Sequence, residues 1–150
     1  MSHRPRFVLD GQLTVDLPPE QAFPLFTAAG ERLWGPGWAP VFLADVGDDS
    51  APGTVWRTTS EGRETTWIVV ESAPPHAATY ARFTPGHSAT TVRVRLEAMD
   101  AATRVHVGYD VTSLEEAADD DLARFAQDFD DMLAEWQSAI AAITPGLRSS

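Results

Sequence analysis

The sequence contains no cysteine, no lysine and no asparagine among its 150 residues. Without cysteine it has no disulfide, no thiolate nucleophile and no thiolate zinc site. Without lysine it has no Schiff-base chemistry. Its 11 basic residues, all arginines, face 22 acidic residues, which gives a net charge of −11. This balance argues against nucleic-acid binding, because that function needs a basic surface.

Long apolar runs are also missing. No stretch approaches the roughly 20 apolar residues of a membrane-spanning helix, and the first seven residues carry two arginines in place of an apolar signal segment. We therefore expect a cytoplasmic protein that does not insert into a membrane. An apolar fraction of 43% is ordinary for a globular protein. The length suits one domain over residues 1–150.

The acidic residues are concentrated in one segment. Residues 113–143 hold nine acids and a single arginine. The same segment carries apolar residues at steps of three and four, which is the period of one helical face: Leu122, Phe125, Phe129, Met132, Leu133, Trp136, Ile140 and Ile143. We expect a long amphipathic helix that begins at a capping box of Ser113 and Glu116 and ends at Pro145.

Most of the remaining chain has the pattern of β-strands. Alternation in the last two strands indicates an antiparallel sheet with one buried and one wet face. Pro18–Phe26 predicts a short helix, limited by Pro24, and a glycine-rich piece with a second short helix follows it. The expected strands cover residues 7–16, 41–46, 54–59, 65–72, 76–84, 88–99 and 104–111. Because only the C-terminal helix is long enough to cover the sheet, a cavity between the two is expected.

This order of elements resembles the START/Bet v1-like (SRPBCC) superfamily. The resemblance includes the stretch Gly30–Pro40, with its two tryptophans around a Gly-Pro-Gly turn, and the segments Gly53–Trp56, Thr66–Val69 and Met132–Trp136. Within the superfamily it points to a bacterial subgroup related to polyketide cyclases and to co-chaperones. It implies an α+β helix-grip fold, in which a seven-stranded curved antiparallel sheet wraps around a long C-terminal helix, with two short helices after the first strand. It also implies a hydrophobic ligand cavity.

Large aromatic residues are the first candidates to line such a cavity. Trp34 and Trp38 either form its mouth or lock the short helices onto the sheet as core residues. Tyr109 shares its strand face with valines, so we place it inside. Met132 is the most adaptable residue on the inner helix face.

The orientation of Tyr80 and Arg82, which share one face of a strand, decides whether they can act on a ligand. We expect them to point outward, with Ala81 and Phe83 inside, because an arginine is rarely buried unpaired. Facing inward, they would instead bind or polarise a ligand carbonyl. The full candidate set for ligand binding is Trp34, Trp38, Trp56, Trp67, Tyr80, Arg82, Tyr109, Phe129, Met132 and Trp136.

Three functions fit these observations. The first is binding of a small hydrophobic ligand, such as a lipid, a polyketide or an aromatic-like compound, by a monomer or homodimer. The second is an aromatase/cyclase-type enzyme that uses Tyr80, Arg82 or Tyr109. The third is a co-chaperone-like interaction through the acidic helix face. We expect no cofactor and no metal, because the four histidines lack ligand spacing and the acidic runs lack a calcium-loop turn.

Overall fold

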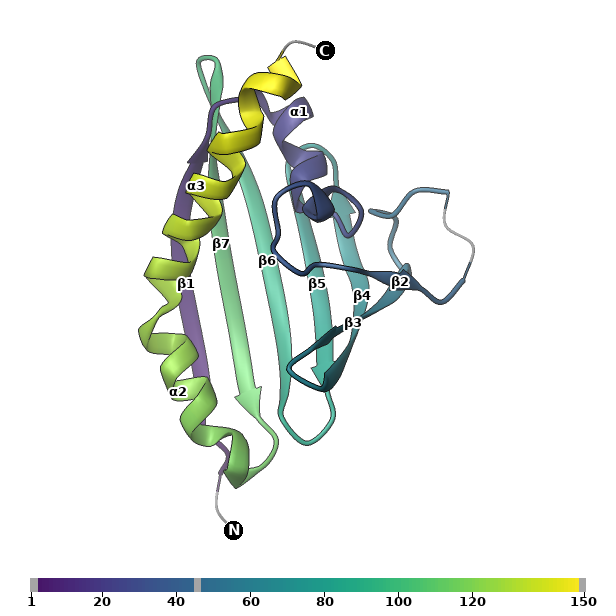
Figure 1. Cartoon of the computed structure of the whole chain (residues 1–150), viewed down its shortest axis with the longest axis vertical. Coiled ribbons are helices and arrows are strands. Elements are labelled where there is room, and N and C mark those ends of the chain that lie inside the picture. Colours follow the sequence, from purple (N-terminus) through teal and green to yellow (C-terminus); the bar gives the residue numbers. More distant parts are fainter. Residues whose placement is uncertain (1–2, 45–46, 149–150) are drawn as a thin grey trace.

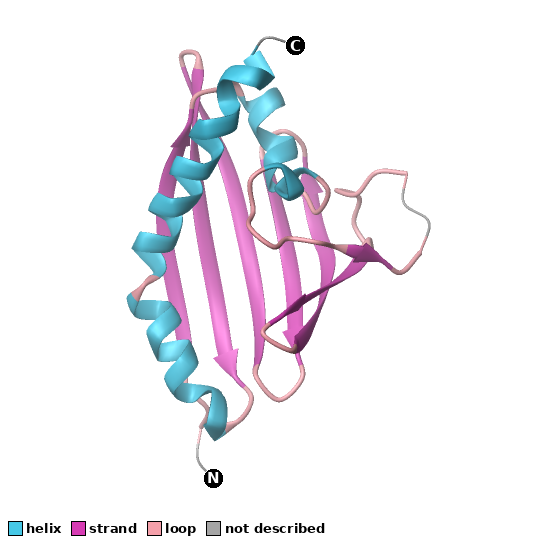
Figure 2. Cartoon of the chain, in the orientation of Figure 1, coloured by secondary structure: helices cyan, strands magenta, loops and turns pink. Residues whose placement is uncertain are grey.

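The computed structural model describes residues 3–44 and 47–148. It contains one antiparallel sheet in the order β1-β7-β6-β5-β4-β3-β2, with the C-terminal helices across one face (Figures 1 and 2). The strands are β1 (Arg6–Val15), β2 (Val41–Phe42), β3 (Val55–Ser60), β4 (Arg63–Ala73), β5 (Ala77–Thr84), β6 (Ser88–Met99) and β7 (Ala102–Ser113). The helices are α1 (Pro19–Ala22), α2 (Asp119–Gln127) and α3 (Phe129–Arg148), with the 3₁₀ helices η1 (Phe23–Phe26), η2 (Gly30–Leu33) and η3 (Glu116–Ala118). The expected helix-grip fold is confirmed.

The sheet follows the period-two pattern of the sequence. On β6 and β7 the central inward positions are apolar and buried, with serine or threonine toward the strand ends, while the alternate positions include arginine, glutamate, histidine and aspartate. The strand expected over residues 41–46 is shorter than predicted, because β2 covers Val41–Phe42 alone and residues 45–46 lie outside the described part. The sheet therefore has one concave, helix-covered face and one outer face.

The C-terminal helix differs from its prediction at both ends. Ser113 closes β7 and its hydroxyl donates to Asp119 Oδ1 at 2.6 Å, so no capping box forms. Asp128 separates α2 from α3. Helix α3 continues through Pro145 to Arg148, where the proline removes a single backbone hydrogen bond. Packing of neighbouring apolar side chains against the core holds this last turn in helical form.

A glycine sets the distance between helix and sheet. A side chain on Gly11 of β1 would place its Cβ 2.5 Å from Leu133 Cδ1 and 3.2 Å from Phe129. Its absence lets α3 pack closely along β1. Helices α2 and α3 thus follow the β1 edge, whereas the segment from α1 to β2 crosses β5 and β4 (Figure 1). The concave face is covered by two separate parts of the chain.

Candidate functional site

One end of the concave face is closed by the segment between α1 and β2. The indole N–H of Trp34 donates to the Leu25 carbonyl at 2.7 Å. That of Trp38 donates to the Ala28 carbonyl, also at 2.7 Å. The hydroxyl of Tyr80 donates to the Phe26 carbonyl at 2.8 Å. We call Phe26, Trp34, Trp38 and Tyr80 the sealed end, because every polar group on these side chains has a partner inside the fold.

The outward orientation expected for Tyr80 and Arg82 is wrong. Tyr80 is 5% exposed, whereas Phe83, expected inside, is 48% exposed. Arg82 is half-buried, with its guanidinium carbon 5.2 Å from the ring centre of Trp67 and 5.3 Å from that of Tyr109. Cation–π contacts with two aromatic faces stabilise this inward arginine. Both rings come from other strands, so the alternation of residues along β5 alone does not predict these contacts.

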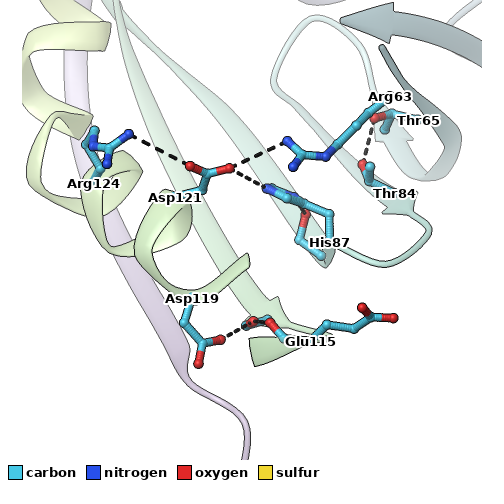
Figure 3. A network of polar contacts seen from close by, with 10 residues as sticks. Arg63, Thr65, Thr84, His87, Glu115, Asp119, Asp121 and Arg124 are labelled. Carbon is cyan, nitrogen blue, oxygen red and sulfur yellow. Dashed lines mark hydrogen bonds and ion pairs between the residues drawn. The ribbon is translucent and has the colours of Figure 1, made fainter. Parts of the chain in front are cut away.

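A pocket of about 300 Å³ opens on the concave face beneath α2. This volume lies at the lower end of the range of ligand sites. Figure 3 shows part of its rim, with Asp121 of α2 pointing toward Arg63 of β4 and His87 of the β5–β6 turn. We call it the mouth pocket, and it is lined by Ser60, Glu61, Arg63, Thr65, Arg82, Thr84, His87, Ser88, Asp121, Leu122 and Phe125. It occupies the expected place between sheet and C-terminal helix.

Arg82 stands at the boundary between this pocket and the interior. It lines the mouth pocket and packs on Trp67 and Tyr109, which line a deeper cavity. Within residues 3–44 and 47–148 it has no carboxylate within 4.0 Å and no hydrogen bond. A guanidinium has five N–H donors and no acceptor. Among the described residues, none of the donors of Arg82 has an acceptor.

The deeper cavity measures about 40 Å³. That is room for very few water molecules and not for an apolar ligand. Aromatic packing fills the surrounding space, as in the stacked rings of Trp56 and Trp67, whose centres lie 5.8 Å apart. The inner cavity is lined by Phe26, Thr27, Ala28, Glu31, Trp38, Trp56, Trp67, Tyr80, Val92, Val94, Tyr109 and Trp136.

Several polar groups on the concave face lack partners among the described residues. The indole N–H of Trp56 and the hydroxyl of Thr90 are buried without a hydrogen bond, and Ser72 holds a third such atom. The hydroxyl of Tyr109 also forms none. Buried polar groups in native proteins are ordinarily satisfied. The region around Arg82 thus differs from the sealed end in its unsatisfied polar groups.

Glu31 of η2 brings a carboxyl group into the same region. Burial raises the pKa of Glu31 to about 7, and the positive charge of Arg82 opposes only part of that effect. Burial also raises the pKa of Tyr109 to about 12 and that of Tyr80 still further, so both phenols remain proton donors. Glu31 therefore exchanges its proton near neutral pH, beside a cation and a phenol. Sequence reasoning missed it, although it is the one acid within Gly30–Pro40.

The structure divides the ten predicted site residues into three groups. Arg82 lines the mouth pocket, and Trp38, Trp56, Trp67, Tyr80, Tyr109 and Trp136 line the inner cavity. Trp34, Phe129 and Met132 line neither, since Trp34 packs on Trp136 and Phe129 packs on Tyr109. The prediction also omitted His87 and Asp121, which come from distant parts of the chain and carry no local sequence signal.

A larger groove of about 800 Å³ lies on the outer face of the sheet. Its wall includes the outward side chains of Ile68 and Phe83. Its charged groups, Arg6 and Asp110, bind each other at 2.6 Å. Arg82 belongs to its lining as well as to that of the mouth pocket, while the guanidinium itself packs on the rings of Trp67 and Tyr109.

Comparisons with known proteins agree with this architecture. Residues 6–140 match the family described as polyketide cyclase/dehydrase and lipid transport. The structure of Ara h 8.0201 is 16% identical, with a TM-score of 0.68 over 97% of this chain and 100% of that one. Norcoclaurine synthase from Thalictrum flavum is 11% identical, with a TM-score of 0.66 over 94% of this chain and 87% of that one. A protein from Rhodobacter sphaeroides is 22% identical, with a TM-score of 0.61 over 91% of this chain and 93% of that one.

No curated protein sequence matches the chain. No helix in the described ranges is long and apolar enough to cross a membrane.

Proposed function

The chain belongs to the polyketide cyclase/dehydrase and lipid transport family, and we propose that it binds one small, largely apolar ligand in the mouth pocket. Arg82 donates hydrogen bonds to a ligand oxygen, and the ligand's apolar body lies against Leu122 and Phe125. The observation that carries this proposal is the unpartnered guanidinium of Arg82, held on Trp67 and Tyr109 at the inner end of an open pocket.

Physical chemistry supports this assignment over the outer groove. A binding site combines apolar walls with a few convergent polar groups that fix orientation. Arg82 lines both sites, but in the mouth pocket it is accompanied by Arg63 and His87 and by the apolar side chains of α2, whereas the arginine that the outer groove adds, Arg6, is already paired with Asp110. A ligand oxygen bound to Arg82 would form a charge-assisted hydrogen bond in a partly desolvated setting, where such bonds are strongest.

The test is a titration followed by quenching of tryptophan fluorescence, with a panel of small lipids and polyphenols. We expect Arg82→Gln to weaken the best-bound compound at least tenfold, about the value of one charge-assisted hydrogen bond. Arg95→Gln, an exposed arginine of β6, is the matched control and should leave the affinity unchanged. Loss of binding in Phe83→Ser with full binding in Arg82→Gln would move the site to the outer groove and contradict the proposal.

The position of Glu31 favours a second candidate, an enzyme of the cyclase type. This reaction requires the reacting end of the ligand to reach from the mouth pocket past Arg82 into an enlarged inner cavity. There Glu31 would remove a proton from the carbon next to the ligand carbonyl, and Arg82 and Tyr109 would donate hydrogen bonds to the enolate oxygen that forms. A group that titrates near the working pH suits proton transfer.

A simple β-diketone in deuterium oxide tests this second candidate, with exchange at the central carbon followed by NMR. Catalysed exchange should be lost in Glu31→Gln and kept in Glu135→Gln, an exposed control on α3. Equal exchange rates with and without the protein would rule out this activity toward β-diketones.

A further inference from the structure

The rim of the mouth pocket contains one carboxylate shared by two arginines and a histidine (Figure 3). Asp121 lies 3.5 Å from Arg63 Nη1, 3.7 Å from His87 Nε2 and 3.8 Å from Arg124 Nη1. Charge-assisted hydrogen bonds are normally about 2.7–2.9 Å long. The pair of Arg6 and Asp110, by comparison, closes to 2.6 Å. The carboxylate of Asp121 is therefore loosely held and can be exchanged for another anion.

The lining of the pocket combines two arginines with two carboxylates. Arg63 and Arg82 face it, against Asp121 and Glu61, and His87 adds a third positive charge when it is protonated. Arg82 has no carboxylate partner among the described residues, and Arg63 and His87 share theirs. Arg82 therefore leaves the pocket a guanidinium to which an incoming anion can bind with charge-assisted hydrogen bonds.

Apolar surface lies directly beside these cations. Phe125 and Leu122, on the inner face of α2, line the same pocket. The ring of Phe125 packs on that of Tyr109, with centres 5.5 Å apart. Tyr109 in turn supports the guanidinium of Arg82. The pocket thus places a cationic rim at one side of a continuous aromatic wall.

Building on the proposed function, we propose that the ligand is an anionic amphiphile whose carboxylate replaces Asp121 as the partner of Arg63 and His87 and also accepts hydrogen bonds from Arg82. Its apolar body lies against Phe125 and Leu122. A carboxylate is the class of anion indicated, because the group that it replaces is itself a carboxylate and because arginine binds planar carboxylates with two parallel hydrogen bonds.

Three probes with alkyl chains of seven or eight carbons test this inference: octanoate, octanol and octyltrimethylammonium, each titrated calorimetrically into the full chain. We expect octanoate to bind about tenfold or more tightly than octanol, as the gain from one charge-assisted contact implies. The cationic probe should bind most weakly. Octyl phosphate in a fourth titration separates a general anion site from one selective for carboxylates.

Two substitutions should act in opposite directions. Asp121→Asn removes the competing carboxylate and should tighten octanoate binding several-fold, whereas Arg63→Gln should weaken it. Octanol affinity should change in neither, and Asp120→Asn, an exposed neighbour on α2, should behave as the wild type. A loss of structure would not produce tighter binding of the anion alone.

The outcomes separate the two proposals. Equal affinities for octanoate and octanol would overturn the anionic class and leave the apolar site standing. Weaker octanoate binding in Asp121→Asn would also overturn it, because Asp121 would then support the ligand rather than compete with it. Absence of binding by all four probes and by the fluorescence panel would contradict the proposed function itself.

Discussion

The sealed end and the mouth pocket lie on the same concave face and differ in how their polar groups are satisfied. At the sealed end, Trp34, Trp38 and Tyr80 each donate a hydrogen bond to a backbone carbonyl of the segment from η1 to η2. Toward the mouth pocket, the donors of Arg82 and Tyr109 have no partner within the described part of the chain. Both regions are rich in aromatic rings, so aromatic content does not distinguish structural from ligand-binding residues, whereas hydrogen-bond satisfaction does.

The largest expected difference is in stability. Trp34→Ala should lower the free energy of unfolding by about 3–5 kcal/mol, because it removes a buried ring packed on Phe26 and Trp136. Phe125→Ala, at a half-buried position beside the mouth, should cost less than half as much and should weaken ligand binding. Urea denaturation measures both. An equal loss of stability in the two variants would remove the distinction between the regions.

Glu31 should make stability depend on pH. Burial raises its pKa from 4.5 to about 7, so the folded state binds the proton more tightly than the unfolded state. The corresponding stability is fully present below pH 4.5 and is lost as the pH rises through 7. Between pKa values of 4.5 and about 7, at about 1.4 kcal/mol per pKa unit, the loss is at most about 3.5 kcal/mol.

The measurement is the difference in unfolding free energy between wild type and Glu31→Gln at pH 5 and pH 8. Wild type should become less stable relative to the variant as the pH rises, whereas Glu135→Gln should follow the wild type. A constant difference between wild type and Glu31→Gln would show that the carboxyl group is solvated in the folded protein.

The two tyrosines provide a matched pair of hydroxyl deletions. Tyr80→Phe leaves the buried Phe26 carbonyl without its donor and should cost about 1–3 kcal/mol. Tyr109→Phe removes a hydroxyl that forms no hydrogen bond with a described residue, so its effect on stability should stay within about 0.5 kcal/mol. Thermal unfolding of both variants gives the answer. A larger loss of stability in Tyr109→Phe than in Tyr80→Phe would contradict the assignment of Tyr80 as the structural tyrosine.

The smallest effect concerns the pH dependence of anion binding. Burial and the positive charge of Arg63 lower the pKa of His87, and Arg82 adds to this, while Asp121 raises it in part. His87 should therefore gain its charge only below its usual pKa of 6.5, and octanoate should bind a few-fold more tightly at pH 5.5 than at pH 7.5. Since Glu31 also titrates in this window, the His87 contribution is the part lost in His87→Gln. An unchanged pH profile in that variant would exclude His87 from the rim.

The sequence predicts the fold well because the fold depends on the spacing of apolar residues along each element and on the order of the elements in the chain. Alternation on β6 and β7 and the apolar stripe of α2 and α3 are local patterns that require no knowledge of partners. The predicted orientation of Arg82 was wrong because it depends on partners that are distant in the sequence. Burial of an arginine is judged by its neighbours, and the two rings that stabilise Arg82 lie on β4 and β7.

The aromatic residues and Arg82 of the candidate site were named from the sequence, but Glu31, His87 and Asp121 were missed. Large rings stand out in a sequence wherever they lie. The significance of Glu31 comes from burial, and that of His87 and Asp121 from tertiary contact across 34 residues of chain. Neither is a property of neighbouring letters in the sequence.

The central claim is that the mouth pocket binds the ligand while the sealed end is structural. The most direct measurement follows the five indole N–H signals of the ¹⁵N-labelled protein by NMR during titration with octanoate. The indole signals of Trp67, beneath Arg82, and of its stacked neighbour Trp56 should shift in proportion to occupancy, while those of Trp34 and Trp38 stay in place. Shifts confined to Trp34 and Trp38, with Trp67 unmoved at saturation, would contradict the account.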